Sequence, residues 1–354
     1  MTPDQTGAMA GHGEYSHHSL AQHTAGGLGL PLWSRAIDDV RALLEDDEPV
    51  TIADLGAAGG RNELVPMKTA VDALRAAGVA APIVVVHTDI ATNDFTTLFE
   101  TIEHDPSSYL AARDVFAFAA GRSFYDRIFP TASLTLAWTA IAVHWLSRVP
   151  TPVLDHIYSE FATGAVREAF AAQSASDWDA FLGARAAELR PGGELVVVGG
   201  AAADDGSSGA TRLMKSVNDA LRAEVADGSV TASEYESMDV PTWNRTLAEF
   251  VAPFAADGSA TAAGVTLLEQ ELVAVPDAYL AAYRDDGDAA RFADAVSGFV
   301  RAFTEPSLFG DLDRPAEQRA AIVDRVYARV RAEAIADPEA FETIWHVALL
   351  RIRR

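Results

Sequence analysis

The residues best suited to chemistry lie in a glycine-rich stretch, IADLGAAGGRNE, over residues 52–63. An apolar segment runs there into a turn, where glycines such as Gly56 let the backbone approach a ligand closely. The stretch lacks the G-x-G-x-x-G spacing of dinucleotide-binding turns, which disfavours a nicotinamide dehydrogenase. Asp54 stands two residues before Gly56, where an acid lies beside an amino or ribose group rather than a pyrophosphate. The stretch favours a nucleoside ligand without phosphates, although a tight strand-to-helix turn with exposed acids would use the same residues.

Two further groups with chemical potential follow along the chain. Asp89 ends the apolar segment 82–89, and an acid at the end of such a strand can accept hydrogen bonds from both ribose hydroxyls. The stretch FPTASLTLAWTAIAVHWLSRVP, residues 129–150, begins like a buried strand and contains His144 and Trp145 side by side. Taken alone, each of these two rings is more typical of a protein core than of a catalytic site.

The elements that must position these residues alternate between strands and helices. Apolar runs predict strands at 50–56, 82–89, 114–121, 132–138, 191–200 and 264–275, and residues 341–352 fit either a seventh strand or a helix. Helical patterns are present at 32–44, 64–77 and 176–190. This alternation predicts a parallel sheet covered by helices on both faces. The mostly helical stretches 204–254 and 277–330 follow the fifth and sixth strands, so we expect a helical cap at the end of the sheet where ligands bind.

The composition is that of an ordinary globular protein, with 49% hydrophobic and 22% charged residues. A net charge of −24 repels phosphate backbones and anionic membranes, so we expect no nucleic-acid partner. There is no cysteine, no apolar run of about 18 residues that could span a membrane and no signal-peptide pattern, so we expect a cytoplasmic protein. His12, His17, His18 and His23 cluster, but no acid or histidine elsewhere has matching ligand spacing, so we expect no metal site.

Seven segments, which together extend over nearly the whole chain, carry a resemblance to a known family. They are GEYSHHSLAQ (13–22), IADLGAAGGRN (52–62), HTDIATNDF (87–95), GRSFYDRIFPTASL (121–134), VHWLSRVP (143–150), WDAFLGARAAELRPGGELVVV (178–198) and RAFTEPSLFG (301–310). On these segments the sequence resembles the SABATH family of S-adenosylmethionine-dependent methyltransferases, which methylate small carboxylic acids and some ring nitrogens. The pattern SFY-x-R-x-FP…HWLS-x-VP is highly specific for that family.

The resemblance implies an α/β fold, a Rossmann-like seven-stranded methyltransferase sheet with an α-helical cap over the active site. The last strand of that sheet is antiparallel, which makes residues 341–352 a strand. We divide the chain into a methyltransferase core with an N-terminal lid segment (1–203), a first cap part (204–263), a core strand (264–276), a second cap part (277–335) and a C-terminal core strand (336–354). Family members are commonly homodimers, so a homodimer is an open expectation here.

The resemblance also assigns roles to single residues. Tyr15 and Ser19 would contact S-adenosylmethionine, while Asp54, Gly56 and Asn62 would line its methionine end. Asp89 and Ile90 would hold the ribose and adenine, and Ser123 and Phe124 would flank the adenine ring. Gln22 and Trp145 would donate hydrogen bonds to the substrate carboxylate, and His144 would line the substrate pocket. Trp243 would be either a pocket wall in the cap region or a core aromatic residue.

The sequence departs from the family pattern at three places. Glu14 and Ser16 flank Tyr15 where the family has serine and alanine, and Arg61 replaces a proline in the glycine loop. Ile141 stands where plant members often have a tyrosine, with alanines nearby at Ala137, Ala140 and Ala142. This substrate-binding wall is therefore expected to be smaller and more apolar than in the aromatic-acid enzymes, which favours an aliphatic acid.

The resemblance implies direct transfer of a methyl group from S-adenosylmethionine to a small-molecule carboxylic acid, which leaves S-adenosylhomocysteine and a methyl ester. The acid would be a fatty acid or an aromatic acid. A carboxylate has a reference pKa of about 4 and is already ionised at pH 7, so it needs no general base. Two alternatives stay open: a nitrogen or phenol acceptor, for which His144 would matter more, and a relative that binds the cofactor without turnover.

Overall fold

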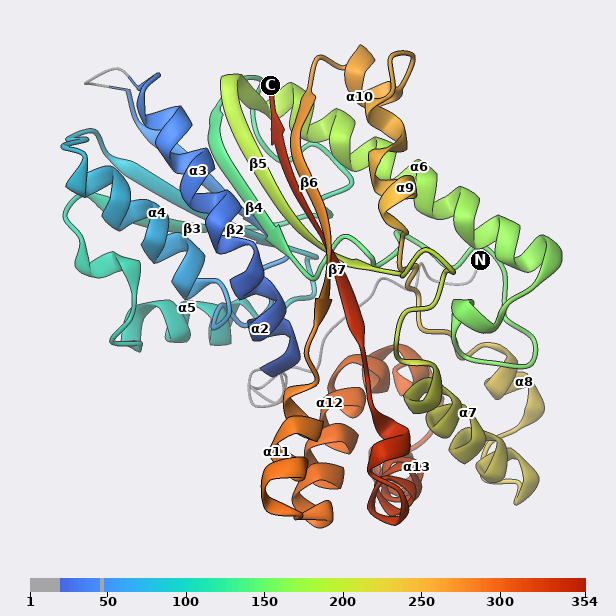
Figure 1. The fold of residues 1–354 in the computed structure, drawn as a ribbon. Helices are drawn as coiled ribbons and strands as arrows, with labels where there is room; N and C mark the ends of the chain where they lie inside the picture. Colours follow the sequence, from blue (N-terminus) through green and yellow to red (C-terminus); the bar gives the residue numbers. More distant parts are fainter. Residues whose placement is uncertain (1–19, 45–47) are drawn as a thin grey trace.

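A seven-stranded sheet forms the centre of the molecule in the computed structural model, which describes residues 20–44 and 48–354 (Figure 1). The strands are β1 (Val50–Leu55), β2 (Ile83–Asp89), β3 (Val115–Gly121), β4 (Leu134–Ala140), β5 (Leu189–Ala201), β6 (Thr266–Val275) and β7 (Trp345–Arg353). Their order across the sheet is β3-β2-β1-β4-β5-β7-β6. β7 runs antiparallel to both β5 and β6, and all other pairs are parallel. The expected fold is confirmed, and residues 341–352 do contain the last strand.

The helices fill the connections between these strands. They are α2 (Leu20–Leu28), α3 (Leu30–Arg41), α4 (Leu64–Ala76), α5 (Phe95–His104), α6 (Gly164–Glu188), α7 (Thr211–Ala226), α8 (Ala232–Glu236), α9 (Leu247–Val251), α10 (Ser259–Ala262), α11 (Ala278–Asp286), α12 (Ala289–Phe309) and α13 (Ala316–Ala336). Short 3-10 turns lie at Tyr109–Ala111, Ser159–Phe161, Ala252–Phe254 and Glu339–Phe341. None of the helices within the described ranges is long and apolar enough to cross a membrane.

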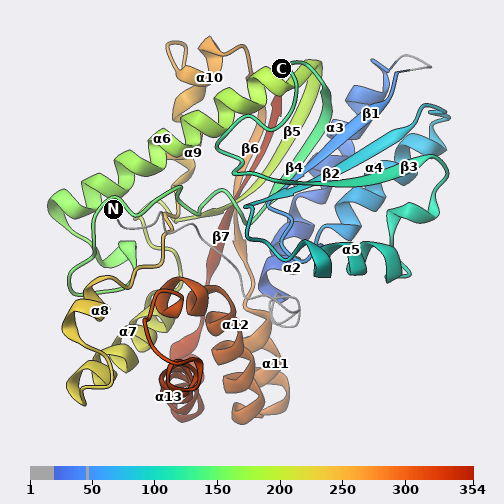
Figure 2. The same cartoon turned by 180° about the vertical axis from the view of Figure 1, so that it is seen from behind.

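Helices cover both faces of the sheet, and each face has its own apolar core. Side chains of α3 and α4, including Trp33 and Met67, pack with Ile52 and Leu136 on one face. On the other face α6 packs its aromatic side chains against the sheet, with α9 and α10 beside it (Figures 1 and 2). The inner strands β1, β4 and β5 are almost fully buried between these layers, as their nearly continuous apolar runs require.

A separate helical cap lies at the carboxyl ends of β5 and β6 (Figure 1). It consists of α7, α8, α11, α12 and α13, which share a large apolar core of their own. Within the stretch expected as the first cap part, 204–263, α9 and α10 pack against α6 on the sheet rather than with the cap helices. Trp145 and Tyr158 belong to the cap core as well, so the chain after β4 joins the cap to the sheet.

Candidate active site

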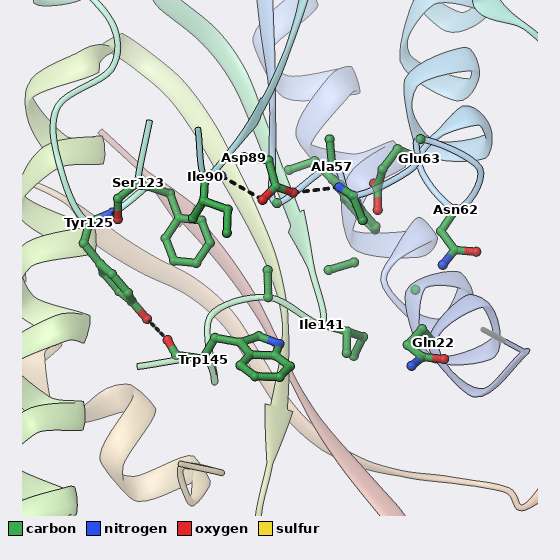
Figure 3. Close-up of a pocket in the computed structure, with 18 of the residues that line it drawn as sticks. Gln22, Ala57, Asn62, Glu63, Asp89, Ile90, Ser123, Tyr125, Ile141 and Trp145 are labelled. Carbon is green, nitrogen blue, oxygen red and sulfur yellow. Dashed lines mark hydrogen bonds between the residues drawn. The ribbon is translucent and has the colours of Figure 1, made fainter. Parts of the chain in front are cut away.

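A cavity of about 650 Å³ lies where β1, β2 and β4 end (Figure 3). Its walls come from the glycine loop after β1, the end of β2, the segment after β3, the turn after β4 and helices α2, α4 and α6. Most residues expected at the active site line it: Gln22, Gly56, Asn62, Asp89, Ile90, Ser123, Phe124, Ile141 and Trp145. Segments far apart in the sequence thus meet at the ligand-binding end of the sheet, as expected for an open parallel sheet.

The glycine loop is held close to β2 by backbone hydrogen bonds. The N–H groups of Gly56 and Ala57 both donate to the carbonyl oxygen of Thr88, at 2.8 and 3.0 Å. Gly56 has a φ of +93°, and a Cβ atom there would lie only 2.6 Å from the Cβ of Ala142. Glycine is therefore required at this position for both its backbone angle and its close packing.

Asp89 is the acid at the end of β2, and both of its oxygens are fixed by backbone donors. Its Oδ2 accepts from the N–H of Ala58 at 2.7 Å, and its Oδ1 accepts from the N–H of Ile90 at 2.7 Å. Asn93 also ties the loop, since its amide donates to the carbonyl oxygen of Ala58 at 3.0 Å. Burial raises the pKa of Asp89, against the lowering effect of the two backbone bonds. The oriented carboxylate can accept hydrogen bonds from the hydroxyls of a bound ribose.

Asp54 does not line the cavity, contrary to the role expected for it. Its side chain is only 1% exposed and lies behind the loop, where its Oδ2 is 2.6 Å from Nδ1 of His87. Period-2 alternation along a strand cannot tell which of two buried faces carries a given side chain. The cavity wall at this end is instead formed by Asn62 and by Glu63, which the sequence reasoning did not single out.

The segment after β3 supplies three consecutive residues of the wall, Ser123, Phe124 and Tyr125. The Phe124 ring packs edge-on against Tyr125, with ring centroids 4.7 Å apart. The Tyr125 hydroxyl donates a hydrogen bond to the carbonyl oxygen of Trp145, as Figure 3 shows. Tyr125 therefore positions the backbone that carries Trp145. Its place inside the SFY pattern was the signal for this role.

A second, narrower cavity of about 70 Å³ adjoins the first and shares Gln22, Ile141 and Trp145 with it. It lies between the sheet and the cap. Besides Trp145, six of its side chains carry rings, namely His144, Tyr158, Phe299, Phe303, Trp345 and His346. Thr242, Asn244 and Gly200 complete much of the remaining wall.

The junction of the two cavities holds two polar groups that have no partner among the described residues. The buried Oε1 of Gln22 accepts no hydrogen bond, and the indole N–H of Trp145 donates none within the part of the chain that the structure describes. Figure 3 shows these two side chains on either side of Ile141, one from α2 and the other from the segment after β4. Buried amides and indoles normally have partners, so this pair points to a ligand with hydrogen-bonding atoms.

Ile141 has a φ of +51°, an unusual backbone angle for a β-branched residue. The angle ends β4 and turns the chain so that Ile141 lines both cavities. Of the alanines expected beside it, Ala140 and Ala142 line the larger cavity. Ala137 does not line this cavity. It lies within β4, before the end of the strand, and is fully buried in the core beneath α6.

His144 lines the narrow cavity and is uncharged there. Burial, together with the positive charge of Arg245, lowers the pKa of His144 to about 4. Its Nδ1 is buried and makes no hydrogen bond to any described residue. An imidazole with so low a pKa is a weak base, which agrees with its expected role as a pocket wall.

Trp243 lies outside both cavities and is a core aromatic residue. It packs with Leu146 and Phe170, and its indole N–H donates to Glu249 at 3.2 Å. Its neighbours Thr242 and Asn244 line the narrow cavity instead. The segment is extended, so alternate side chains point to opposite sides, and the side chain of Trp243 points away from the narrow cavity.

The remaining sequence expectations lie at the chain start. Tyr15 and Ser19, together with His12, His17 and His18, fall outside the described residues. His23 lies within them and lines the larger cavity. No group of three or more histidine, aspartate or glutamate side chains able to hold a metal ion is found in residues 20–44 and 48–354.

Comparison with known proteins decides the family. A family model for "SAM dependent carboxyl methyltransferase" matches residues 5–352. The chain belongs to this family. The resemblance inferred from the sequence is therefore confirmed, and so is S-adenosylmethionine as the cofactor. The fixed Asp89, the close-packed glycine loop and the aromatic wall at Phe124 are features that fit this cofactor.

Several relatives in the family act on different acids, as their names state. The chain is 30% identical over 245 residues to methyltransferase LUC1 of Fusarium sp, covering 68% of this chain and 64% of that protein. It is 32% identical to gibberellic acid methyltransferase 2 of Arabidopsis thaliana over 52% of this chain and about half (51%) of that protein. Rice indole-3-acetate O-methyltransferase 1 is 28% identical, with 70% of each chain covered.

A solved structure supports the fold over the whole chain. Loganic acid methyltransferase with SAH superimposes with a TM-score of 0.80 at 22% identity, covering 98% of each chain. At this identity the match establishes the fold alone, including the seven-stranded sheet with its cap.

Proposed function

We propose that this protein forms the methyl ester of a small carboxylic acid whose carboxylate lies between Gln22 and Trp145. The observation that carries the proposal is the pair of polar side chains at the junction of the two cavities. The indole N–H of Trp145 has no acceptor among the described residues, and the Gln22 amide, whose oxygen has no described donor, presents its NH2 group to a carboxylate when its O and N positions are exchanged. In this arrangement the larger cavity takes the cofactor and the narrow one takes the body of the acid. Bound S-adenosylmethionine supplies an electrophilic methyl group.

The residues around the junction suit an acceptor that is already ionised. A carboxylate with a pKa of about 4 needs no base at pH 7. The narrow cavity has no lysine or arginine in its described lining, and its buried His144 is a weak base because its pKa is about 4. Neutral donors orient the carboxylate without the strong ground-state stabilisation of an ion pair, which would oppose a reaction that removes the negative charge. The site is less suited to methylating a phenol or a ring nitrogen, because such an acceptor needs a base.

The ring-lined wall supports a small planar acid rather than a long chain. Phe299, Phe303 and Trp345 face a space of only about 70 Å³. The alanine-rich strand end favoured an aliphatic acid, but Ala137 does not reach the cavity. Besides Gln22, the wall also holds three buried polar atoms without a described partner, Nδ1 of His144, Oγ1 of Thr242 and Nδ1 of His346. We therefore favour an aromatic acid that carries a second hydrogen-bonding group.

The test is a mass-spectrometric screen of methyl transfer by the purified protein. The panel contains benzoic and hydroxybenzoic acids, ring-bearing acetic acids, fatty acids of medium and long chain, and matched phenols and ring nitrogens without a carboxyl group. We expect methyl esters from the ring acids, with hydroxylated rings preferred. Esterification of fatty acids alone would overturn the choice of acid, whereas methylation of the acids' phenol or nitrogen analogues alone would overturn the proposed reaction.

A further inference from the structure

Glu63 is a buried acid on the wall of the cofactor cavity. It directly precedes α4, is only 5% exposed and lies beside Asn62 in Figure 3. Its Oε2 is buried and accepts no hydrogen bond from any described residue. An acid in this position is costly unless something compensates its charge.

A chain of hydrogen bonds lies behind Glu63. It begins at Asp54, whose Oδ2 is 2.6 Å from Nδ1 of His87, and Nε2 of His87 is 2.7 Å from the hydroxyl of Tyr109. Burial lowers the pKa of His87 to about 4 and raises the pKa of the Tyr109 phenol, so both are uncharged at neutral pH. The phenol therefore donates to Nε2, and Nδ1–H donates to Asp54. This chain holds Asp54 in place through its Oδ2 atom, so its Oδ1 atom stays available for contact with Glu63.

Asp54 and Glu63 form a pair of neighbouring buried acids. Oδ1 of Asp54 and Oε2 of Glu63 each lack a donor among the described residues. Two ionised carboxylates offer only acceptors, so a direct contact between them requires a proton on one of the two. Burial raises the pKa of both groups; the charge of Asp89 further raises the pKa of Asp54, and the charge of Asp54 further raises the pKa of Glu63.

The surroundings of the pair hold no fixed cation to balance it. Neither carboxylate forms an ion pair with a lysine or arginine among the described residues. The polar and titratable groups that neighbouring elements bring to the pair and its hydrogen-bond chain are His87 and Asp89 of β2, Tyr109 of the turn before β3, the uncharged Trp138 of β4, and Asn62 and Arg61 of the loop. Arg61 lines the cavity but is exposed. A ligand cation at the cavity wall would supply the missing positive charge.

We propose that Glu63 is the residue that binds the α-ammonium group of the cofactor, and that Asp54 behind it holds the shared proton. This inference rests on the placement of the cofactor in the larger cavity but not on the acid substrate. A cation at Glu63 favours the ionised form of the pair. Binding therefore releases protons, and affinity rises with pH over the range in which the empty pair titrates.

Two ligands separate this contact from the rest of the cavity. S-adenosylhomocysteine carries the ammonium group and cannot transfer a methyl group, while 5′-methylthioadenosine carries the adenosine and sulfur but no amino acid. Calorimetry in buffers of different ionisation enthalpy measures affinity and proton release together. For the unaltered protein we expect proton release and pH-dependent affinity with S-adenosylhomocysteine, and neither with 5′-methylthioadenosine. An absence of proton release with S-adenosylhomocysteine would overturn the shared proton.

Two isosteric variants then distinguish the two acids. In Glu63→Gln the amide can donate to Asp54, but the charged contact is lost, so S-adenosylhomocysteine should bind about tenfold more weakly and without proton release. In Asp54→Asn the amide can accept from His87 and donate to Glu63, so affinity should change less than about threefold while the pH dependence disappears. Asp72→Asn is the matched control, because Asp72 lies on the same helix α4 and its side chain is 54% exposed.

Binding of 5′-methylthioadenosine reports whether each variant keeps an intact adenosine site. An unchanged affinity of Glu63→Gln for S-adenosylhomocysteine would overturn the proposal, and so would equal weakening of both ligands, which would make Glu63 a support of the loop. Weakening in Asp54→Asn but not in Glu63→Gln would assign the contact to Asp54 instead. None of these outcomes depends on methyl transfer, so the acid proposed above can fail or succeed separately.

Discussion

Replacing Trp145 by phenylalanine tests the proposed contact with the substrate carboxylate most directly. The substitution removes the indole N–H, which has no hydrogen-bond partner among the described residues, and keeps an aromatic ring at the junction. Its backbone stays fixed, because the Tyr125 hydroxyl bonds to the carbonyl oxygen of residue 145. A hydrogen bond to a charged group contributes about 1.5–3 kcal/mol, so kcat/KM for the acid should fall by about 10- to 100-fold.

The assay measures methyl ester formation at limiting acid concentration, together with the affinity for S-adenosylhomocysteine, which should change less than about threefold. Trp178→Phe is the control. Trp178 is fully buried in α6 and lines neither cavity, and its indole N–H donates to the carbonyl oxygen of Phe250 at 3.0 Å. That variant should lose stability, by about 1–3 kcal/mol, with activity per folded molecule unchanged. A kcat/KM of Trp145→Phe within twofold of the unaltered protein would refute the reasoning.

Three further outcomes follow from the structure. Burial raises the pKa of Asp239 from 3.8 to about 7, so the folded state binds the carboxyl proton more tightly than the unfolded state. The free energy of unfolding therefore falls as pH rises from about 4 through 7, by at most on the order of 4 kcal/mol. Asp239→Asn should therefore stabilise the protein at pH 8 and much less at pH 5 in thermal unfolding; an equal effect at both pH values would contradict this. Gly29→Ala should lower the free energy of unfolding by about 1–3 kcal/mol, because its Cβ would lie 2.3 Å from the side chain of Val198. The control is Gly27→Ala, whose Cβ would meet nothing within 4 Å. Equal urea midpoints for the two variants would count against this packing. Phe303→Ala should widen the narrow cavity and raise kcat/KM for bulkier ring acids relative to benzoic acid; an unchanged ratio in competition assays would place the acid elsewhere.

The sequence predicted the parts of the molecule that depend on local pattern. Each apolar run became a strand within a few residues of its expected bounds, because buried parallel strands need continuous apolar side chains. The helix expected at 176–190 begins at Gly164 instead, since its first turns are rich in alanine and show little apolar periodicity. The sequence did not show that α9 and α10 lie on α6, because only tertiary packing places them there.

The side-chain directions at the site could not be predicted in the same way. Trp243 and Ala137 stand within segments that contribute to the cavities, yet both point into the core. Glu63 lines the cavity wall where Asp54 was expected. Asp54 is buried behind the loop, and the sequence does not show which of the two acids the packing against β2 buries away from the cavity. The resemblance located the correct segments, and the folded backbone decided which neighbour faces the ligand.

The place of β7 between β5 and the edge strand β6 also affects how the chain folds. β5 ends at Ala201 and β7, its neighbour on that side, begins at Trp345, so every cap helix lies between two adjacent strands. β6 pairs with no strand other than β7 among the described residues, and it therefore joins the sheet only after β7 has docked. Pairing over such sequence separations is slow, because the entropy of loop closure is lost before contacts form. Until then β5 presents an unpaired apolar edge, the point at which a partly folded chain is most exposed to aggregation.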